Sequence, residues 1–261
     1  MDRYLVDLKS SLRILRRSPG LALSAVAALA MGIGFTTTMF SIVHGGTRDL
    51  PFDEPRELVV LTRTEPRRGF DLDPSAFDYV EWARQQRSFV ALSAFEANSM
   101  NLAGDARRPD RRSGAGVTPG AFELLGELPL LGRGLLPDDA TSGAPAVVLL
   151  GYDLWRARFD ADSDVVGRVV RVNGLPRTVV GVMRPRFGFP VNSELWIPLE
   201  VDPDAQPSAQ GSGLRVFGRL RDGVGLDEAR AEVATIADRL ARQYPETHEG
   251  LSARAYPFVE M

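Results

Sequence analysis

The pattern of apolar and polar residues divides the chain into one long apolar segment and a mixed remainder. Residues 20–43 run for 24 positions without a charged residue, an amide side chain or a proline. At about 1.5 Å per helical residue this segment would measure about 36 Å, which exceeds the roughly 30 Å of a bilayer hydrocarbon core. We therefore expect a transmembrane helix over residues 20–43.

The residues before this segment predict a short amphipathic helix at the membrane surface. Within residues 1–19, apolar side chains recur at helical spacing, with arginines placed to meet lipid phosphates. The triplet Ser18–Pro19–Gly20 then breaks the helix. The predicted organisation is a cytoplasmic helix over residues 1–19, a transmembrane helix over 20–43 and an exported domain over 44–261.

In the exported domain the pattern changes between strand-like alternation and helical periodicity. Predicted strands cover residues 57–64, 89–95, 146–150, 166–172, 175–182, 195–199, 214–220 and 251–258. Predicted helices cover residues 76–86, 152–159 and 226–243. This mixture, without regular β-α-β alternation, predicts an α+β fold of two subdomains.

Three local signals place individual element ends. Ser75 followed by Asp78 is typical of a capping box at the start of a helix. Thr118 before Pro119 predicts the start of a short helix that Gly126 ends. Asn173–Gly174 between two β-rich runs predicts a hairpin with a type I′ turn.

The charge distribution orients the predicted membrane helix. Residues 1–47 carry a net charge of +3 and residues 48–261 a net charge of −6, which together give the −3 of the chain. Basic residues directly before an apolar segment keep the N-terminus in the cytoplasm, so the main domain is predicted to lie outside it. A cleaved signal peptide is the alternative, but its apolar region is shorter and ends in a small-residue cleavage pattern that residues 42–46 lack. The pair Arg16–Arg17 invites a twin-arginine interpretation, but a hydrophobic continuation does not follow it.

The residue inventory excludes most catalytic sites. The chain has no cysteine and two histidines, His44 and His248, so a Cys–His pair is impossible and a serine triad would depend on His248. Both histidines are predicted to be surface residues. The only lysine, Lys9, does not follow a glycine-rich phosphate-binding loop, so any ATP must be bound by another chain. We predict no catalytic residue, no cofactor and no enzymatic activity.

The acidic residues show no metal-binding or nucleic-acid-binding pattern. Asp160, Asp162 and Asp164 resemble the start of a calcium loop, but Val165 and Arg171 stand where an EF-hand has glycine and glutamate. We interpret this segment as an acidic turn and predict no metal site. The charges of the main domain are acidic and dispersed, so no nucleic-acid partner is expected.

The predicted membrane helix carries a face of small residues. Ala28, Gly32, Gly34 and Thr37 would allow another helix to approach closely and to form hydrogen bonds across the contact. A lone anchor does not need such a face. The pattern therefore favours packing against other permease helices or a second copy of the chain.

Three segments occur in an order that carries a family resemblance. Residues 7–43 combine an arginine-rich helix, Ser-Pro-Gly and a Gly-Ile-Gly apolar helix, and residues 116–139 read GVTPGAFELLGELPLLGRGLLPDD. Further matching positions follow at Leu154–Trp155, Arg158–Phe159, Val166–Gly167–Arg168, Asn173–Gly174, Val179–Met183, Phe187, Phe189–Pro190 and Leu195–Leu199. Over nearly its whole length the chain resembles MacB-like, FtsX-related permeases of ABC transport systems, with the MacB-like periplasmic core domain.

The resemblance implies a mechanical function at the bacterial inner membrane. A cytoplasmic ATPase subunit would move the membrane helices, and the periplasmic domain would shift against a periplasmic protein partner. Gly167, Gly174, Gly181 and Gly188 would then specify turns, and Trp155, Phe187 and Trp196 the core. Such a permease continues with further membrane helices, so the chain is expected to be the N-terminal part of one. The alternatives are a stand-alone anchored interaction module and an exported enzyme with an all-carboxylate site.

Overall fold

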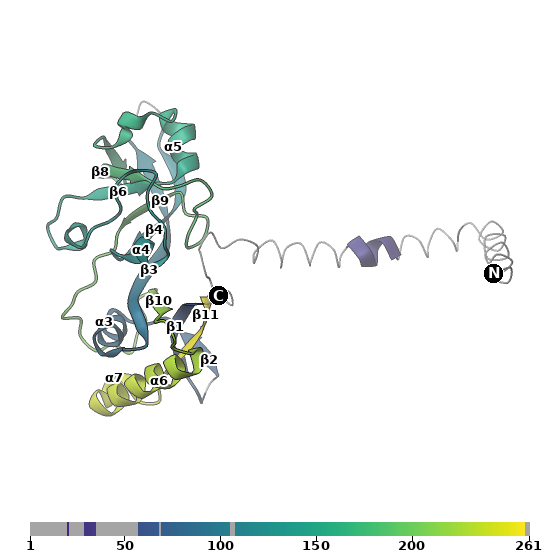
Figure 1. Cartoon of the computed structure of the whole chain (residues 1–261), viewed down its shortest axis with the longest axis vertical. Coiled ribbons are helices and arrows are strands. Elements are labelled where there is room, and N and C mark those ends of the chain that lie inside the picture. Colours follow the sequence, from purple (N-terminus) through teal and green to yellow (C-terminus); the bar gives the residue numbers. More distant parts are fainter. Residues whose placement is uncertain (1–19, 21–28, 35–56, 68, 105–107, 259–261) are drawn as a thin grey trace. The chain divides into compact units, whose positions relative to one another are not determined.

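The computed structural model (Figure 1) describes residue 20 and residues 29–34, 57–67, 69–104 and 108–258. The chain divides into two compact units, Met1–Leu50 and Pro51–Met261.

In the first unit, residues 29–34 are helical and exposed. Across the described residues, no helix has both the length and the apolar character needed to cross a membrane. The helices expected over residues 1–19 and 20–43 lie mostly outside the described residues, so they stay predictions.

The first lobe of the second unit is an antiparallel sheet covered by helices. Its elements are β1 (Leu58–Glu65), α3 (Ala76–Gln85), β3 (Phe89–Ala103), β10 (Arg215–Leu220), α6 (Leu226–Gln243) and β11 (Ser252–Pro257). The strands lie in the order β11-β1-β10-β3, each antiparallel to its neighbours. This is the β-α-β-β-α-β arrangement of ferredoxin-like folds. Two short elements extend it, β2 (Phe70–Leu72) beside β1 and α7 (Pro245–His248) after α6.

Strand β1 is apolar at consecutive positions because both of its faces are covered. Val59 and Leu61 pack with residues of α3 and α6 in one core cluster. Leu58 and Val60 alternate with them, so they point to the opposite face, and they are equally buried. A strand buried on both sides is expected to show such an uninterrupted apolar run.

The second lobe is inserted between β3 and β10. Its elements are β4 (Asp110–Val117), α4 (Ala121–Leu124), β5 (Leu131–Gly132), β6 (Val147–Leu150), α5 (Tyr152–Phe159), β7 (Val169–Val172), β8 (Leu175–Val182) and β9 (Leu195–Pro198). Pairing runs β3-β4-β9-β6-β8-β7 and returns from β7 to β3, so these strands form a closed ring. A second core cluster, with Val148, Leu150 and Trp155 among its members, fills this lobe.

The predicted hairpin closes the ring. Asn173 and Gly174 have φ angles of 52° and 83°, as a type I′ turn requires. The backbone N–H of Asn173 donates to the carbonyl oxygen of Asn101 at 2.9 Å, and Asn173 Oδ1 accepts from the Asn101 backbone at 2.9 Å. The turn is thereby fastened to β3, the strand that both lobes share.

The first and last strands of the domain are neighbours. In the β1–β11 pair Val59 lies opposite Pro257. Because the strands are antiparallel, the N-terminal end of β1 and the C-terminal end of β11 lie side by side at one end of the sheet.

Several sequence predictions need correction. The helix expected at Thr118–Pro119 starts later, with Gly120 as its N-cap, because the Thr118 hydroxyl instead bonds to the backbone of Ala94. Strand β3 runs to Ala103 and not to Phe95, since both lobes supply partners along it. The first strand of the hairpin starts at Val169 and not at 166. Strands β2, β4 and β5 were not predicted.

The edge strand β5 depends on a glycine. Gly132 has a φ of +70°, and a Cβ there would lie 2.2 Å from the Val180 carbonyl oxygen. We expect Gly132→Ala to lower the free energy of unfolding by about 2–3 kcal/mol. Gly126 has a similar φ of +77° but open space around it, so Gly126→Ala should cost only about 1 kcal/mol. Urea unfolding followed by tryptophan fluorescence measures both, and equal losses would show that the close approach of β8 is irrelevant.

Candidate functional site

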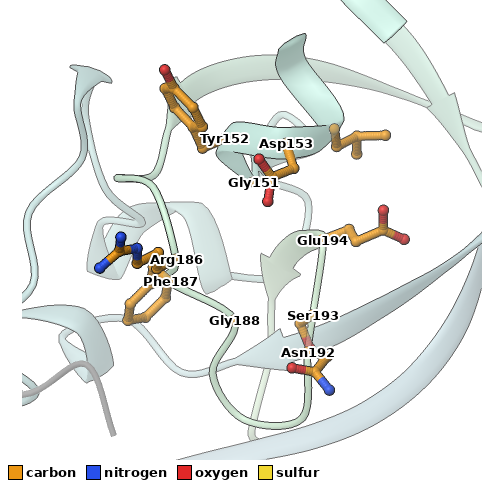
Figure 2. Close-up of a pocket in the computed structure, with 10 residues that line it drawn as sticks. Gly151, Tyr152, Asp153, Arg186, Phe187, Gly188, Asn192, Ser193 and Glu194 are labelled. Atoms are coloured by element: carbon orange, nitrogen blue, oxygen red, sulfur yellow. The ribbon is translucent and has the colours of Figure 1, made fainter. Parts of the chain in front are cut away.

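A hollow of about 390 Å³ opens beside the start of α5 (Figure 2). Three segments line it: the first turn of α5, the loop after β8 and the residues before β9. The backbone N–H of Gly151 donates to the Glu194 carbonyl oxygen at 2.7 Å and joins the first of these segments to the third. In Figure 2, Arg186 and Glu194 lie on opposite sides of the hollow.

The charged groups of the hollow do not form a catalytic pair. Glu194 accepts a hydrogen bond from Arg112 Nη1 at 3.0 Å, and Asp110 contacts the same guanidinium. Burial alone would lower the pKa of Arg112, but attraction and hydrogen bonds from these two carboxylates raise it above its ordinary value. Glu194 is thus held by a permanent cation, while Asp153 is exposed. The hollow offers two carboxylates but no bonded nucleophile and base.

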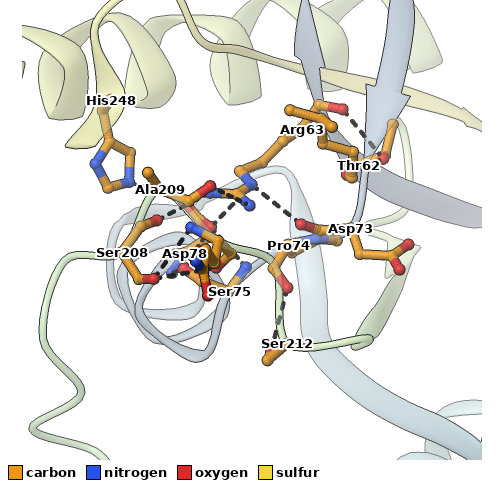
Figure 3. A network of polar contacts seen from close by, with 12 residues as sticks. Thr62, Arg63, Asp73, Pro74, Ser75, Asp78, Ser208, Ala209, Ser212 and His248 are labelled. Atoms are coloured by element: carbon orange, nitrogen blue, oxygen red, sulfur yellow. Dashed lines mark hydrogen bonds and ion pairs between the residues drawn. The ribbon is translucent and has the colours of Figure 1, made fainter.

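A buried polar network lies between β1 and the helices of the first lobe (Figure 3). Its centre is an ion pair in which Arg63 Nε lies 3.4 Å from Asp78 Oδ2, with both side chains 2% exposed. Asp78 also accepts hydrogen bonds from the backbone N–H and hydroxyl of Ser75, and its own backbone N–H donates to the Ser75 hydroxyl oxygen, which completes the predicted capping box of α3. His248 Nε2 lies 3.1 Å from the other carboxylate oxygen, Asp78 Oδ1.

The expectation that His248 is a surface residue was wrong. The residue is 3% exposed, and its Nδ1 lies 2.7 Å from the Thr247 hydroxyl. Although Ser75, Asp78 and His248 meet, the order of contacts differs from a catalytic triad, in which the imidazole lies between the hydroxyl and the carboxylate. Here the carboxylate lies in the middle, so the serine has no base. The arrangement fits a structural role.

Arg63 fastens a long loop to the first lobe. Its Nη1 and Nη2 donate to the carbonyl oxygens of Ser208 and Ala209 at 3.0 and 3.2 Å, and its Nε donates to that of Asp73 at 3.1 Å. These acceptors lie in the connections before α3 and before β10. A single guanidinium therefore holds both connections against β1, as its fan of donors allows.

An aromatic cluster joins the two lobes. It lies on the sheet face away from α3 and α6 and consists of Phe95, Phe122, Phe187, Phe189, Trp196, Phe217 and Phe258. Phe189 of the inserted lobe contacts Phe95 and Phe217 with ring centroids 5.1 and 5.2 Å apart. Its carbonyl oxygen accepts from Trp196 Nε1 at 2.6 Å. The predicted core role of Phe187 and Trp196 is consistent with their burial.

Beside the cluster lies a crevice of about 350 Å³ between the lobes. Phe95, Ala97 and Val191 contribute apolar lining, and Asp73 and Arg215 contribute an ion pair at 3.5 Å. Between the two lobes, packed aromatic rings thus lie next to an open crevice.

The predicted acidic turn is confirmed. Asp162 Oδ1 accepts from the backbone of Asp164 at the start of a 3₁₀ turn, Ser163–Val165, and its carboxylate contacts Arg168. Among the residues that the structure describes, no three acidic or histidine side chains gather as metal ligands would.

The predicted membrane-packing residues lie partly within the described chain. Gly32 and Gly34 are helical and exposed, and a Cβ built on either meets nothing within 4 Å. Ala28 and Thr37 lie outside the described residues. The buried network and the aromatic cluster were not predicted, because each assembles residues far apart in the chain.

The domain thus combines a ferredoxin-like lobe with an inserted strand ring, and the charged groups of its buried network bond to one another. The MacB-like periplasmic core domain family matches residues 22–236. The chain belongs to this family, whose members are periplasmic domains of ABC transporter permeases.

Three solved structures share the fold. A domain of a candidate permease protein from Porphyromonas gingivalis has a TM-score of 0.61 at 14% identity, covering 80% of this chain and 92% of that one. The periplasmic region of MacB from Actinobacillus actinomycetemcomitans has a TM-score of 0.55 at 17% identity, covering 77% and 89%. The extracellular domain of the noncanonic ABC-type transporter YknZ from Gram-positive bacteria has a TM-score of 0.53 at 16% identity, covering 75% and 98%.

One curated relative is similar in sequence. It is the "Probable syringafactin export ATP-binding/permease protein SyfD" of Pseudomonas syringae pv. syringae, 34% identical over 89 residues. The match covers 33% of this chain and 14% of that protein, so the chain spans a small part of the relative's length.

Proposed function

We propose that the chain is the N-terminal part of a permease-type subunit in an ABC export or mechanotransmission system, with its periplasmic domain moved by a separate ATPase. The observation that carries the proposal is the family match over residues 22–236. This match begins inside the predicted membrane helix and continues through the folded domain. It supports the proposal that the predicted membrane helix and the folded domain are parts of one permease at the bacterial inner membrane.

In this proposal residues 20–43 cross the bilayer with the N-terminus in the cytoplasm, residues 1–19 lie at the cytoplasmic surface and residues 44–261 are periplasmic. Ala28, Gly32, Gly34 and Thr37 face a neighbouring permease helix or a second copy of the chain. Among the described residues, a Cβ at Gly32 or Gly34 meets nothing within 4 Å, which is compatible with this role.

The domain is suited to passing on movement and not to catalysing a reaction. The N-terminal end of β1 follows the proposed membrane segment, and Arg63 on β1 holds the connections to α3 and β10. Movement entering at β1 would thereby reach β3, which continues into the inserted lobe. A periplasmic protein partner would receive this movement at the surface of the domain.

Co-purification from native membranes tests the proposal. We expect the tagged chain to retain a nucleotide-binding subunit, and the double variant Gly32→Leu, Gly34→Leu to reduce the retained amount about tenfold. That factor corresponds to about 1.4 kcal/mol, and the reason for the loss is that a leucine at either position keeps the neighbouring backbone from approaching closely. Deleting residues 1–19 should also weaken the contact.

Gly20→Leu is the matched control, since a Cβ at Gly20 also meets nothing within 4 Å but the residue stands at the start of the predicted membrane segment, 12 positions before Gly32. It should leave the retained ATPase unchanged. If native complexes never contain a nucleotide-binding subunit, the transport proposal fails, and a stand-alone anchored interaction module explains the chain better.

A further inference from the structure

A small internal cavity lies in the first lobe between α3, α6 and β11. Its volume is about 10 Å³, and its lining includes Arg63, Asp78, Trp82, His248 and Ser252. This volume is about that of a single water-sized probe, close to the smallest cavity that holds one water molecule. Purely apolar cavities stay dry, but this one is lined by five residues with polar side chains.

Trp82, one of the lining residues, has a buried polar atom without a hydrogen-bond partner among the described residues. The residue is 1% exposed, and within the described residues its indole Nε1 has no hydrogen-bond acceptor. The other two tryptophans of the chain are different: Trp155 Nε1 donates to the Asp162 carbonyl oxygen at 2.8 Å, and Trp196 Nε1 donates to that of Phe189 at 2.6 Å. A buried indole N–H without an acceptor is costly, so native proteins nearly always provide one.

We propose that this cavity is a binding site for one buried water molecule, which accepts the hydrogen bond from Trp82 Nε1. The water would donate a hydrogen bond to the Asp78 carboxylate, since the Arg63 guanidinium beside it has no acceptor to offer. Two to four polar partners are what a buried water needs. The water would join Trp82 of α3 to the network in Figure 3. This inference does not depend on the proposed transport function.

NMR tests the proposal by measuring magnetisation transfer from water to the indole N–H groups. The sample is the full chain in nanodiscs, with ¹⁵N-labelled tryptophan. Only three indole N–H signals exist, one for each tryptophan. We expect Trp82 alone to show a cross-peak at the water frequency with opposite signs in NOE and ROE spectra, the signature of a long-lived bound water. Trp155 and Trp196 serve as internal controls, and Trp155→Phe and Trp196→Phe assign the signals.

A substitution that fills the cavity gives the second measurement. Ala237 of α6 lines the cavity, so Ala237→Val should abolish the Trp82 cross-peak while its indole signal persists. Ala231→Val, at an exposed position of the same helix, should leave the cross-peak intact. The proposal is overturned if wild-type Trp82 shows no water cross-peak, or only one with the equal signs of proton exchange. It is also overturned if the cross-peak survives in a folded Ala237→Val variant.

Discussion

Replacing Asp78 with alanine is expected to lower the free energy of unfolding by about 3–5 kcal/mol, as removal of one partner of a buried ion pair does. Asp78 is 1% exposed and is the common acceptor of Ser75 and His248 and the counterion of Arg63. Without it, the guanidinium of Arg63 stays buried with carbonyl oxygens as its remaining partners. Chemical denaturation of the full chain in detergent, followed by tryptophan fluorescence, gives the value.

Asp227→Ala is the matched control for this prediction. Asp227 also lies in the first turn of a helix and pairs with Arg230 at 2.9 Å, but its side chain is 96% exposed. Its removal should change stability by about 0–1 kcal/mol. If the free energy of unfolding falls by a similarly small amount in both variants, the buried network does not stabilise the domain, and Asp78 acts only as a helix-capping residue.

Phe189→Ala is expected to lower the free energy of unfolding by about 3–5 kcal/mol and to weaken the coupling between the lobes. The ring fills the centre of the aromatic cluster and contacts Phe95, Phe217 and Phe258 of the first lobe. Its loss leaves a cavity at the junction, while the hydrogen bond of Trp196 to the Phe189 backbone can persist. Calorimetry should therefore show two unfolding transitions where the wild type shows one.

Phe70→Ala controls for the loss of an aromatic ring as such. Phe70 lies on β2 and is 48% exposed, so its removal should change stability by about 0.5 kcal/mol or less. A single transition in Phe189→Ala, shifted no further than in Phe70→Ala, would show that the Phe189 ring does not couple the lobes.

The sequence predictions succeeded where a few neighbouring residues decide the structure. The helices expected over residues 152–159 and 226–243 have these bounds in the structure, and in the second of them the periodic apolar residues that predict the helix are buried. The Ser75–Asp78 capping box and the Asn173–Gly174 turn were predicted for the same reason. In each case the signal lies within a single element or turn.

The predictions failed where distant segments decide the structure. Strand β4 reads DRRSGAGV, a sequence with low strand propensity, and it forms because β3 and β9 both pair with it. His248 is buried through a contact with Asp78, 170 positions away. No local pattern reveals such a contact, although Pro245 at the start of α7 does mark the short helix that places the histidine.

The N-terminal end of β1 and the C-terminal end of β11 are neighbours, so the domain can be handled as one unit with a single point of attachment. Adjacent strands are about 4.8 Å apart, so the polypeptide enters and leaves the domain at nearly one point. A short linker could join Pro257 to Leu58, and new termini could be opened in an exposed loop such as the one at Gly143, giving a circularly permuted domain with the same core. Because the domain begins and ends at nearly one point, it could be placed between two neighbouring helices of another protein, or removed from between them, without a change in the distance between those helices.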